Sequence, residues 1–116
     1  MIRHICLLIL ISLFSSLALA AGEVYVLRLD DEIGSRTWRY TREALNEAET
    51  RGADMVLVHL NTYGGSVVHA DSIRTALLNH PGKVVAFVDN NAASAGALIA
   101  LACDTAVSYT HLTLPT

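Results

Sequence analysis

The sequence predicts an α/β domain built around a parallel β-sheet. Short apolar runs typical of buried strands alternate with longer stretches of helical periodicity, and the alternation continues from residue 24 to residue 107. Gly, Pro, Asn or Ser stands at the boundaries between these runs. Strands that alternate with helices form parallel sheets with right-handed crossover connections, so the order of the runs indicates the fold class.

The N-terminal segment, residues 1–20, resembles a signal peptide. A positive start at Arg3 is followed by an apolar run over residues 5–17 and by small residues that end at Ala20. We expect cleavage after Ala20, which leaves residues 21–107 as the folded domain. The alternative is an uncleaved anchor helix, but the apolar run is shorter than the roughly 20 residues that span a bilayer.

The first strand is predicted at residues 24–29, where it ends at an acidic triplet. Ser35 is predicted to cap a helix that runs to residue 51, and Gly52 supplies the stop. The helix carries a loose apolar stripe made of Trp38, Leu45 and Ala48. This stripe would pack the helix against the sheet.

The remaining elements follow without a linker or repeat. They are a strand at residues 55–60, a turn at 61–66, a helix at 67–79, a strand at 84–88, a turn at 90–93, an apolar helix at 94–103 and a strand from 104 to 107. Each helix returns the chain to the start of the next parallel strand. The carboxyl ends of the strands therefore meet at one edge, where such sheets bind ligands.

Two unusual turns stand at this edge. Paired Gly64 and Gly65 can adopt positive φ and can present backbone N–H groups without an intervening Cβ, as an oxyanion hole requires. Ser94 opens the apolar helix, with Ala95 and then Gly96 behind it, and Gly96 would allow tight helix packing. We interpret Ser94 as a nucleophile, with the N–H groups of Gly65 and Ala95 as oxyanion donors. The alternative is that Ser94 is only an N-cap and the glycines only a turn.

The sequence offers no convincing base for this serine. His59 lies inside a predicted strand, His69 is more typical of a solvated helix residue, and His80 belongs to a helix terminator. His111 lies in a C-terminal stretch that fits no element, and Lys83 opens a strand at the end opposite to the site. A nucleophilic serine needs an adjacent base, so the site is incomplete on these residues.

Composition argues against several other classes of function. The chain has 8 Lys and Arg against 11 Asp and Glu, and its basic residues do not cluster, so nucleic acid is not an expected partner. The turn at 61–66 lacks the Lys-Ser/Thr of a phosphate loop, and no Gly-x-Gly-x-x-Gly follows the first strand. No His or Cys spacing suggests a metal site, so we expect neither metal nor cofactor.

Residues 23–107 resemble the NfeD group of membrane-bound ClpP-class serine peptidases, which are related to signal peptide peptidase A and ClpP. The resemblance lies in the strand and turn Leu-Asn-Thr-Tyr-Gly-Gly at 60–65, and in the segment Ala-Ser-Ala-Gly at 93–96 with the apolar helix after it. The family usually has proline where Tyr63 stands. The fold implied is the ClpP/crotonase-like α/β fold, truncated.

By this resemblance, Ser94 matches the nucleophile of the family, and Gly65 and Ala95 match its oxyanion donors. Gly64 and Gly96 support the two turns. The family base is a lysine roughly forty residues beyond the serine, and ClpP uses a histidine nearer to it; either would follow Thr116. Residues 108–116 fit nothing in the family pattern, and we interpret them as a non-homologous tail or sequencing artefact.

The resemblance also implies an exported, membrane-associated endopeptidase that acts outside the cytoplasm on hydrophobic peptides or membrane proteins. Stomatin-like proteins are implied partners, and the full-length protein is expected to be a homo-oligomer. The fragment itself is expected to be inactive without its base. Two alternatives remain open: a non-catalytic scaffold or binding module with the same fold, and a crotonase-like acyl-thioester enzyme, which would not need Ser94 or an export signal.

Overall fold

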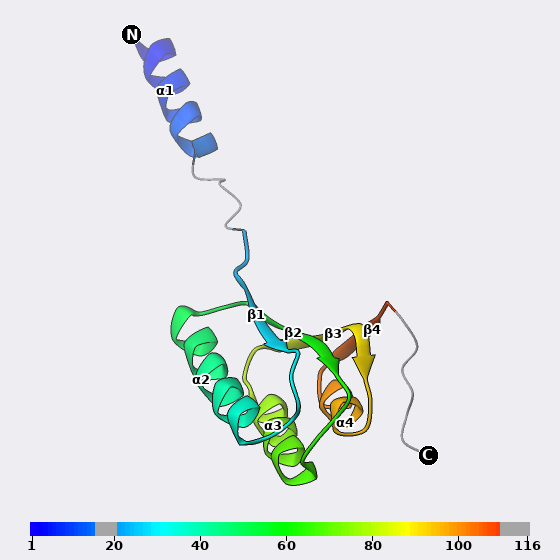
Figure 1. Cartoon of the computed structure of the whole chain (residues 1–116). Helices are drawn as coiled ribbons and strands as arrows, with labels where there is room; N and C mark the ends of the chain where they lie inside the picture. Colours follow the sequence, from blue (N-terminus) through cyan, green and yellow to red (C-terminus); the bar gives the residue numbers. More distant parts are fainter. Residues whose placement is uncertain (16–20, 110–116) are drawn as a thin grey trace.

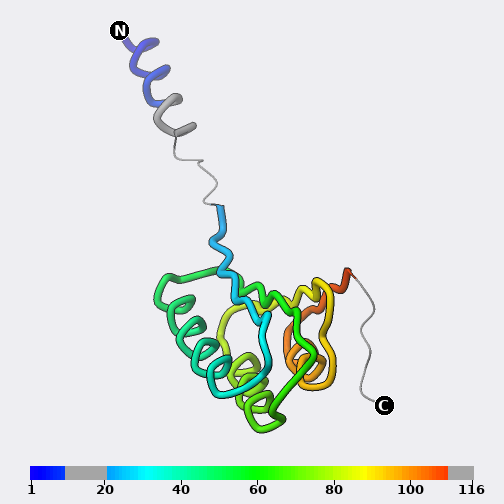
Figure 2. The backbone as a smooth tube through the Cα atoms, in the orientation of Figure 1, coloured from blue at the N-terminus to red at the C-terminus, as the bar shows by residue number. Residues whose placement is uncertain are grey.

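The computed structural model describes residues 1–15 and 21–109 (Figures 1 and 2). Its elements are α1 (Ile2–Ser15), β1 (Val24–Leu29), α2 (Ser35–Arg51), β2 (Met55–Thr62), α3 (Val67–Asn79), β3 (Lys83–Ala92), α4 (Ala95–Leu101) and β4 (Thr105–Ser108). The four strands form one parallel sheet in the order β1-β2-β3-β4. The predicted α/β class and the alternation of elements are confirmed.

The helices α2, α3 and α4 lie on one face of the sheet (Figure 1). Consecutive strands in sequential order with right-handed crossovers place every connecting helix on the same side. Along β2, alternate residues from Val56 to Thr62 are buried, and the residues between them are partly exposed. The buried set packs with helix residues such as Ile73 and Ile99 into one core. Side-chain alternation in strands thus divides the sheet into a core face and an open face.

The start of α2 differs from the prediction. Gly34 is the N-cap and Ser35 is the first helical residue, and no side chain caps the helix. Thr37 compensates because its Oγ1 accepts a hydrogen bond of 2.7 Å from the Gly34 N–H. The predicted stop is confirmed: Gly52 ends the helix with φ of 67°. The stripe of the helix also contains Thr37 and the fully buried Thr41.

Strand β3 is longer than predicted, and it includes most of the segment expected to be a turn. Its pairing with β2 runs regularly to Leu60 and Val88, and then resumes at Thr62 and Ala92. Residues 89–91 of β3 therefore face a single residue of β2, which is a bulge. Bulges re-aim the chain, and this one brings β3 to the turn that contains Ser94.

The terminal predictions are only partly covered by the described residues. The helix α1 has 14 residues, and within residues 1–15 and 21–109 no helix is long and apolar enough to cross a membrane. The expected cleavage segment before Ala21 lies outside the described residues. At the other end, Ser108 still pairs with Val88 in β4, and residues 110–116 lie outside the described part.

Candidate active site

The structure brings the glycine turn and the serine turn together at the carboxyl ends of β2 and β3. A Cβ added to Gly64 would lie 3.1 Å from the Cβ of Ser94 and 3.4 Å from the backbone nitrogen of Ala95. Because only hydrogen atoms separate these groups, the two turns are in van der Waals contact. Residues 30 positions apart in the chain thus form one cluster, as the sequence predicts.

Ser94 has a strained backbone. Its φ of 52° and ψ of −114° make it the non-glycine residue with positive φ among those that the structure describes. Such conformations cost about 1–3 kcal/mol and persist where the surrounding structure enforces them, often at active sites. A serine on a strained turn between strand and helix, with its hydroxyl exposed, is the arrangement of a nucleophile elbow.

The hydroxyl of Ser94 does not serve the helix. Ser94 occupies the N-cap position of α4, yet its side chain forms no capping hydrogen bond, and the residue is exposed. A structural N-cap would accept a hydrogen bond from an N–H in the first turn. The exposed hydroxyl of Ser94 therefore argues against the capping alternative that the sequence left open.

Gly65 is held by a backbone bridge to Ile33, a residue of the loop between β1 and α2. The Ile33 N–H donates to the Gly64 carbonyl at 2.9 Å, and the Ser66 N–H donates to the Ile33 carbonyl at 2.7 Å. In a parallel bridge of this pattern, the N–H of Gly65 itself points away from Ile33. A side chain is excluded here, because a Cβ on Gly65 would lie 2.7 Å from the Ile33 nitrogen.

Two backbone donors remain available in this cluster. Within residues 21–109, the N–H groups of Gly65 and Ala95 donate to no protein acceptor. Ala95 is the first residue of α4, where N–H groups have no partner inside the helix. Free backbone N–H groups of this kind are the donors that an oxyanion hole requires.

Gly96 packs the serine turn against β2. A Cβ on Gly96 would lie 2.7 Å from Cγ2 of Thr62, so alanine would require one of the two segments to move. The tight packing expected from the sequence is therefore present, and Thr62 is the residue it involves. Thr62 received no role in the sequence analysis.

A pocket of about 510 Å³ opens beside the glycine turn. It is lined by Asp30, Asp31, Glu32, Asn61, Thr62, Tyr63, Gly64, Gly65 and Asn90. Gly64 connects this pocket to the serine, because it lines the pocket and also contacts Ser94. The pocket lies beyond the strand ends, which is where parallel sheets bind ligands.

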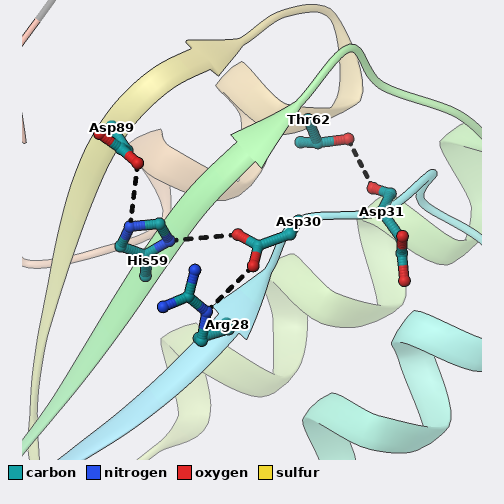
Figure 3. A network of polar contacts seen from close by, with 6 residues as sticks. All are labelled: Arg28, Asp30, Asp31, His59, Thr62 and Asp89. Carbon is teal, nitrogen blue, oxygen red and sulfur yellow. Dashed lines mark hydrogen bonds and ion pairs between the residues drawn. The ribbon is translucent and has the colours of Figure 1, made fainter.

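The histidine in β2, His59, is part of a network of polar contacts on the open face of the sheet (Figure 3). His59 Nδ1 lies 3.2 Å from Asp30 Oδ1, and its Nε2 lies 3.4 Å from Asp89 Oδ2. Arg28 Nε contacts the other Asp30 oxygen at 3.0 Å. Only 14% of the His59 side chain is exposed. Sequence reasoning missed this network, although the parallel pairing of β1 and β2 places Arg28 opposite His59.

The other candidate bases are engaged or distant. His69 Nδ1 lies 2.9 Å from Ser66 Oγ, and Lys83 stands at the start of β3, whereas Ser94 follows its end. Across residues 1–15 and 21–109, no group of three His, Cys, Asp or Glu side chains is arranged to hold a metal ion.

Burial, with a smaller contribution from Asp104, raises the pKa of the Cys103 thiol to about 12. Cys103 is therefore a neutral packing residue at physiological pH.

Comparisons with known proteins identify the family of this chain. The family described as "NfeD1b, N-terminal domain" matches residues 23–113. "Membrane protein NfeD1b" of Bacillus subtilis (strain 168) is 31% identical over 81 residues, which are 70% of this chain and 18% of that protein. The chain thus spans less than a fifth of this relative.

Solved structures of peptidases resemble this chain in fold and in sequence. The 1510-N membrane protease specific for a stomatin homolog from Pyrococcus horikoshii has a TM-score of 0.70 and 27% identity, over 77% of this chain and 46% of that one. A serine-to-alanine mutant of the 1510-N membrane-bound stomatin-specific protease has a TM-score of 0.71 and 26% identity, over 78% of this chain and 45% of its own. ClpP1 from Listeria monocytogenes has a TM-score of 0.58 and 25% identity, over 68% of this chain and 46% of its own.

These neighbours are peptidases with the ClpP-like fold, and the relatives are named membrane proteins. The resemblance to NfeD proteins drawn from the motifs at 60–65 and 93–96 is therefore confirmed. The match covers most of the chain and includes both turns of the candidate site. The chain belongs to the NfeD family, as a protein with an NfeD1b N-terminal domain.

Proposed function

We propose that this chain carries the nucleophile and the oxyanion hole of a membrane-associated serine endopeptidase. The observation that carries the proposal is the strained, uncapped Ser94 in contact with the glycine turn. The strained backbone of Ser94 supports no capping hydrogen bond of the helix. Such strain is typical of a nucleophilic serine, because it orients the side chain toward the substrate.

In the proposed reaction, Ser94 Oγ attacks the carbonyl carbon of a peptide bond. The carbonyl oxygen gains negative charge and accepts hydrogen bonds from the N–H groups of Gly65 and Ala95. The C–N bond then breaks, the amine leaves with a proton, and water releases the acyl group from Ser94. Loss of one oxyanion donor reduces kcat by about 10²–10³-fold in comparable enzymes.

The general base is the part of the site that the described residues do not supply. Both ring nitrogens of His59 contact carboxylates, and His69 forms a hydrogen bond with Ser66. We propose that the base is a lysine that is not among the described residues. Support comes from the 1510-N protease, which was solved as a serine-to-alanine mutant and, with a substrate peptide bound, as a lysine-to-alanine mutant. A desolvated lysine becomes neutral and can accept the serine proton.

The proposal extends to substrate and location. We propose hydrophobic segments of membrane-associated proteins as substrates and stomatin-like proteins as partners, supported by the stomatin specificity of the 1510-N protease. The apolar segment before Ala21 supports export and a site outside the cytoplasm. Exposed valines on the open sheet face, Val24 and Val26, support burial of this face in a larger protein or homo-oligomer.

A peptide boronic acid tests the nucleophile and the oxyanion hole together. Boron-11 NMR of the full-length gene product with a hydrophobic peptide boronate is expected to show a four-coordinate adduct. The adduct should be lost in Ser94→Ala and retained in Ser35→Ala, a matched change at an exposed serine. In the full-length gene product, Ser94→Ala should lower peptide hydrolysis at least about 10³-fold.

Hydrolysis that survives Ser94→Ala unchanged would overturn the peptidase proposal. Peptide binding without any adduct, in the full-length gene product, would favour the non-catalytic binding module instead.

A further inference from the structure

We infer that Thr62 is a positioning residue that fixes the glycine turn and the serine turn relative to each other. The inference deepens the proposed function and, for its catalytic consequence, rests on it. Thr62 ends β2, and only 2% of its surface is exposed, so a polar side chain occupies a core position. Buried hydroxyl groups are normally satisfied by specific partners.

The hydroxyl of Thr62 connects the loop after β1 to the glycine turn. Its Oγ1 donates to the Asp31 carbonyl at 2.8 Å, shown in Figure 3, and accepts from the Gly64 N–H at 3.2 Å. A hydroxyl can donate one hydrogen bond, and Thr62 donates it to the Asp31 carbonyl. The lone pairs of the oxygen then remain for Gly64. One hydroxyl thus fixes the residue directly before the proposed donor Gly65.

The carbonyl and the methyl group of Thr62 connect the same residue to the serine turn. The carbonyl oxygen accepts from the Ala93 N–H at 3.1 Å, immediately before Ser94. Its Cγ2 lies so close to Gly96 that no side chain fits there. The serine turn is therefore held at both of its ends by Thr62.

Thr62 also stands where the sheet pairing resumes. After the bulge at residues 89–91, the pair Thr62 and Ala92 is the last contact between β2 and β3 before both chains leave the sheet. Because Thr62 contacts both turns, a shift of this pair would change the position of Gly65 relative to Ala95. Displacements of about 1 Å in a catalytic arrangement are enough to lower rates about 100-fold.

Threonine is the residue that serves both connections. Valine would keep the methyl group against Gly96 but leave the Gly64 N–H and the Asp31 carbonyl without their partner. Serine would keep the hydroxyl but remove Cγ2 from Gly96. The two substitutions therefore separate the hydroxyl function of Thr62 from its packing function, and each predicts a different response of the two turns.

The test compares Thr62→Val and Thr62→Ser by amide hydrogen exchange and NMR on the whole chain. Thr62→Val should accelerate exchange of the Gly64 amide at least about tenfold and shift the Gly65 resonance. Thr62→Ser should leave Gly64 exchange within about twofold of wild type and shift the Gly96 resonance instead. The control is Thr41→Val, since Thr41 is equally buried and donates to the Thr37 carbonyl at 2.8 Å.

In the full-length gene product, Thr62→Val should lower kcat about 10- to 100-fold with KM within about threefold, and Thr62→Ser should restore most of kcat. Thr41→Val should leave both constants unchanged. A loss in KM alone would overturn the positioning role, because it would indicate a contact with bound substrate rather than alignment of the reacting groups.

The inference is overturned if Gly64 exchange in Thr62→Val stays at the wild-type rate, or rises equally in Thr41→Val. If Thr62→Val does not fold, Thr62→Ser decides alone: tenfold faster Gly64 exchange in this variant would contradict the hydroxyl connection. A wild-type full-length gene product without hydrolytic activity would overturn the proposed function, while the exchange data would still decide the structural role of Thr62.

Discussion

Replacing Gly65 with alanine tests the backbone bridge that orients the proposed oxyanion donor. An added Cβ would overlap the Ile33 backbone, and Gly65 also has φ of +149°, which L-residues rarely adopt. Two other glycines allow the steric overlap and the backbone strain to be measured separately. Gly52 has φ of +67° with no atom within 4 Å of an added Cβ, and Gly34 has open space at φ of −155°.

The three substitutions should form a graded series. For Gly34→Ala, the gain from a stiffer unfolded chain offsets the weaker cap, so the free energy of unfolding should change by less than about 1 kcal/mol. Gly52→Ala adds the cost of a left-handed backbone, about 1–2 kcal/mol. Gly65→Ala adds an overpacking cost of about 1–3 kcal/mol to that strain, which gives roughly 3 kcal/mol.

Urea unfolding monitored by Trp38 fluorescence measures the series. Trp38 is the single tryptophan of the chain and is packed against the core, so its emission reports unfolding of the domain. A loss in Gly65→Ala no larger than that in Gly52→Ala would refute the reasoning. It would mean that Ile33 can move away from the turn, and that the bridge does not fix the direction of the Gly65 N–H.

Two further predictions concern strain and ionisation. Ser94→Gly should stabilise the chain by about 1 kcal/mol in urea unfolding while abolishing the boronate adduct, because glycine relieves the positive φ; a loss of stability would contradict the strain. Burial and Asp104 raise the pKa of Cys103 from 9.0 to about 12, so the unfolded chain loses the thiol proton at lower pH than the folded chain. The free energy of unfolding should therefore fall between pH 9 and 12, by about 1.4 kcal/mol at pH 10 relative to pH 8. Urea unfolding at both pH values should show this extra loss in wild type and not in Cys103→Ala; equal losses would refute it.

The sequence predicted the elements well where local periodicity determines them. The strand at 24–29 and the helix at 67–79 have the predicted boundaries, because their apolar patterns and turn residues act within a few positions. The third strand was placed four residues short at its end. Its extension to Ala92 depends on pairing with Thr62, a residue 30 positions away, and no local pattern contains that information.

In the candidate site as well, features that depend on local sequence could be predicted, and features that depend on distant contacts could not. Gly64, Gly65 and Ser94 could be selected from the sequence because glycine pairs and a lone hydroxyl at strand ends are chemically unusual. The strain of Ser94 could not be predicted, since serine at a helix start normally adopts an ordinary cap conformation. The bridge from Ile33 was also missed, because this residue lies in a loop between β1 and α2 that carries no motif.

The missed contacts explain how a strained serine can persist in so small a domain. Local sequence alone would let the serine turn relax, so the strain must be balanced by contacts from elsewhere in the chain. Thr62 holds Ala93 and Gly96 on either side of Ser94, and Ile33 holds the turn that Ser94 contacts. The candidate site is therefore assembled by three consecutive strand ends. It follows that substitutions in the loop after β1 should alter the proposed catalysis through the direction of the Gly65 N–H.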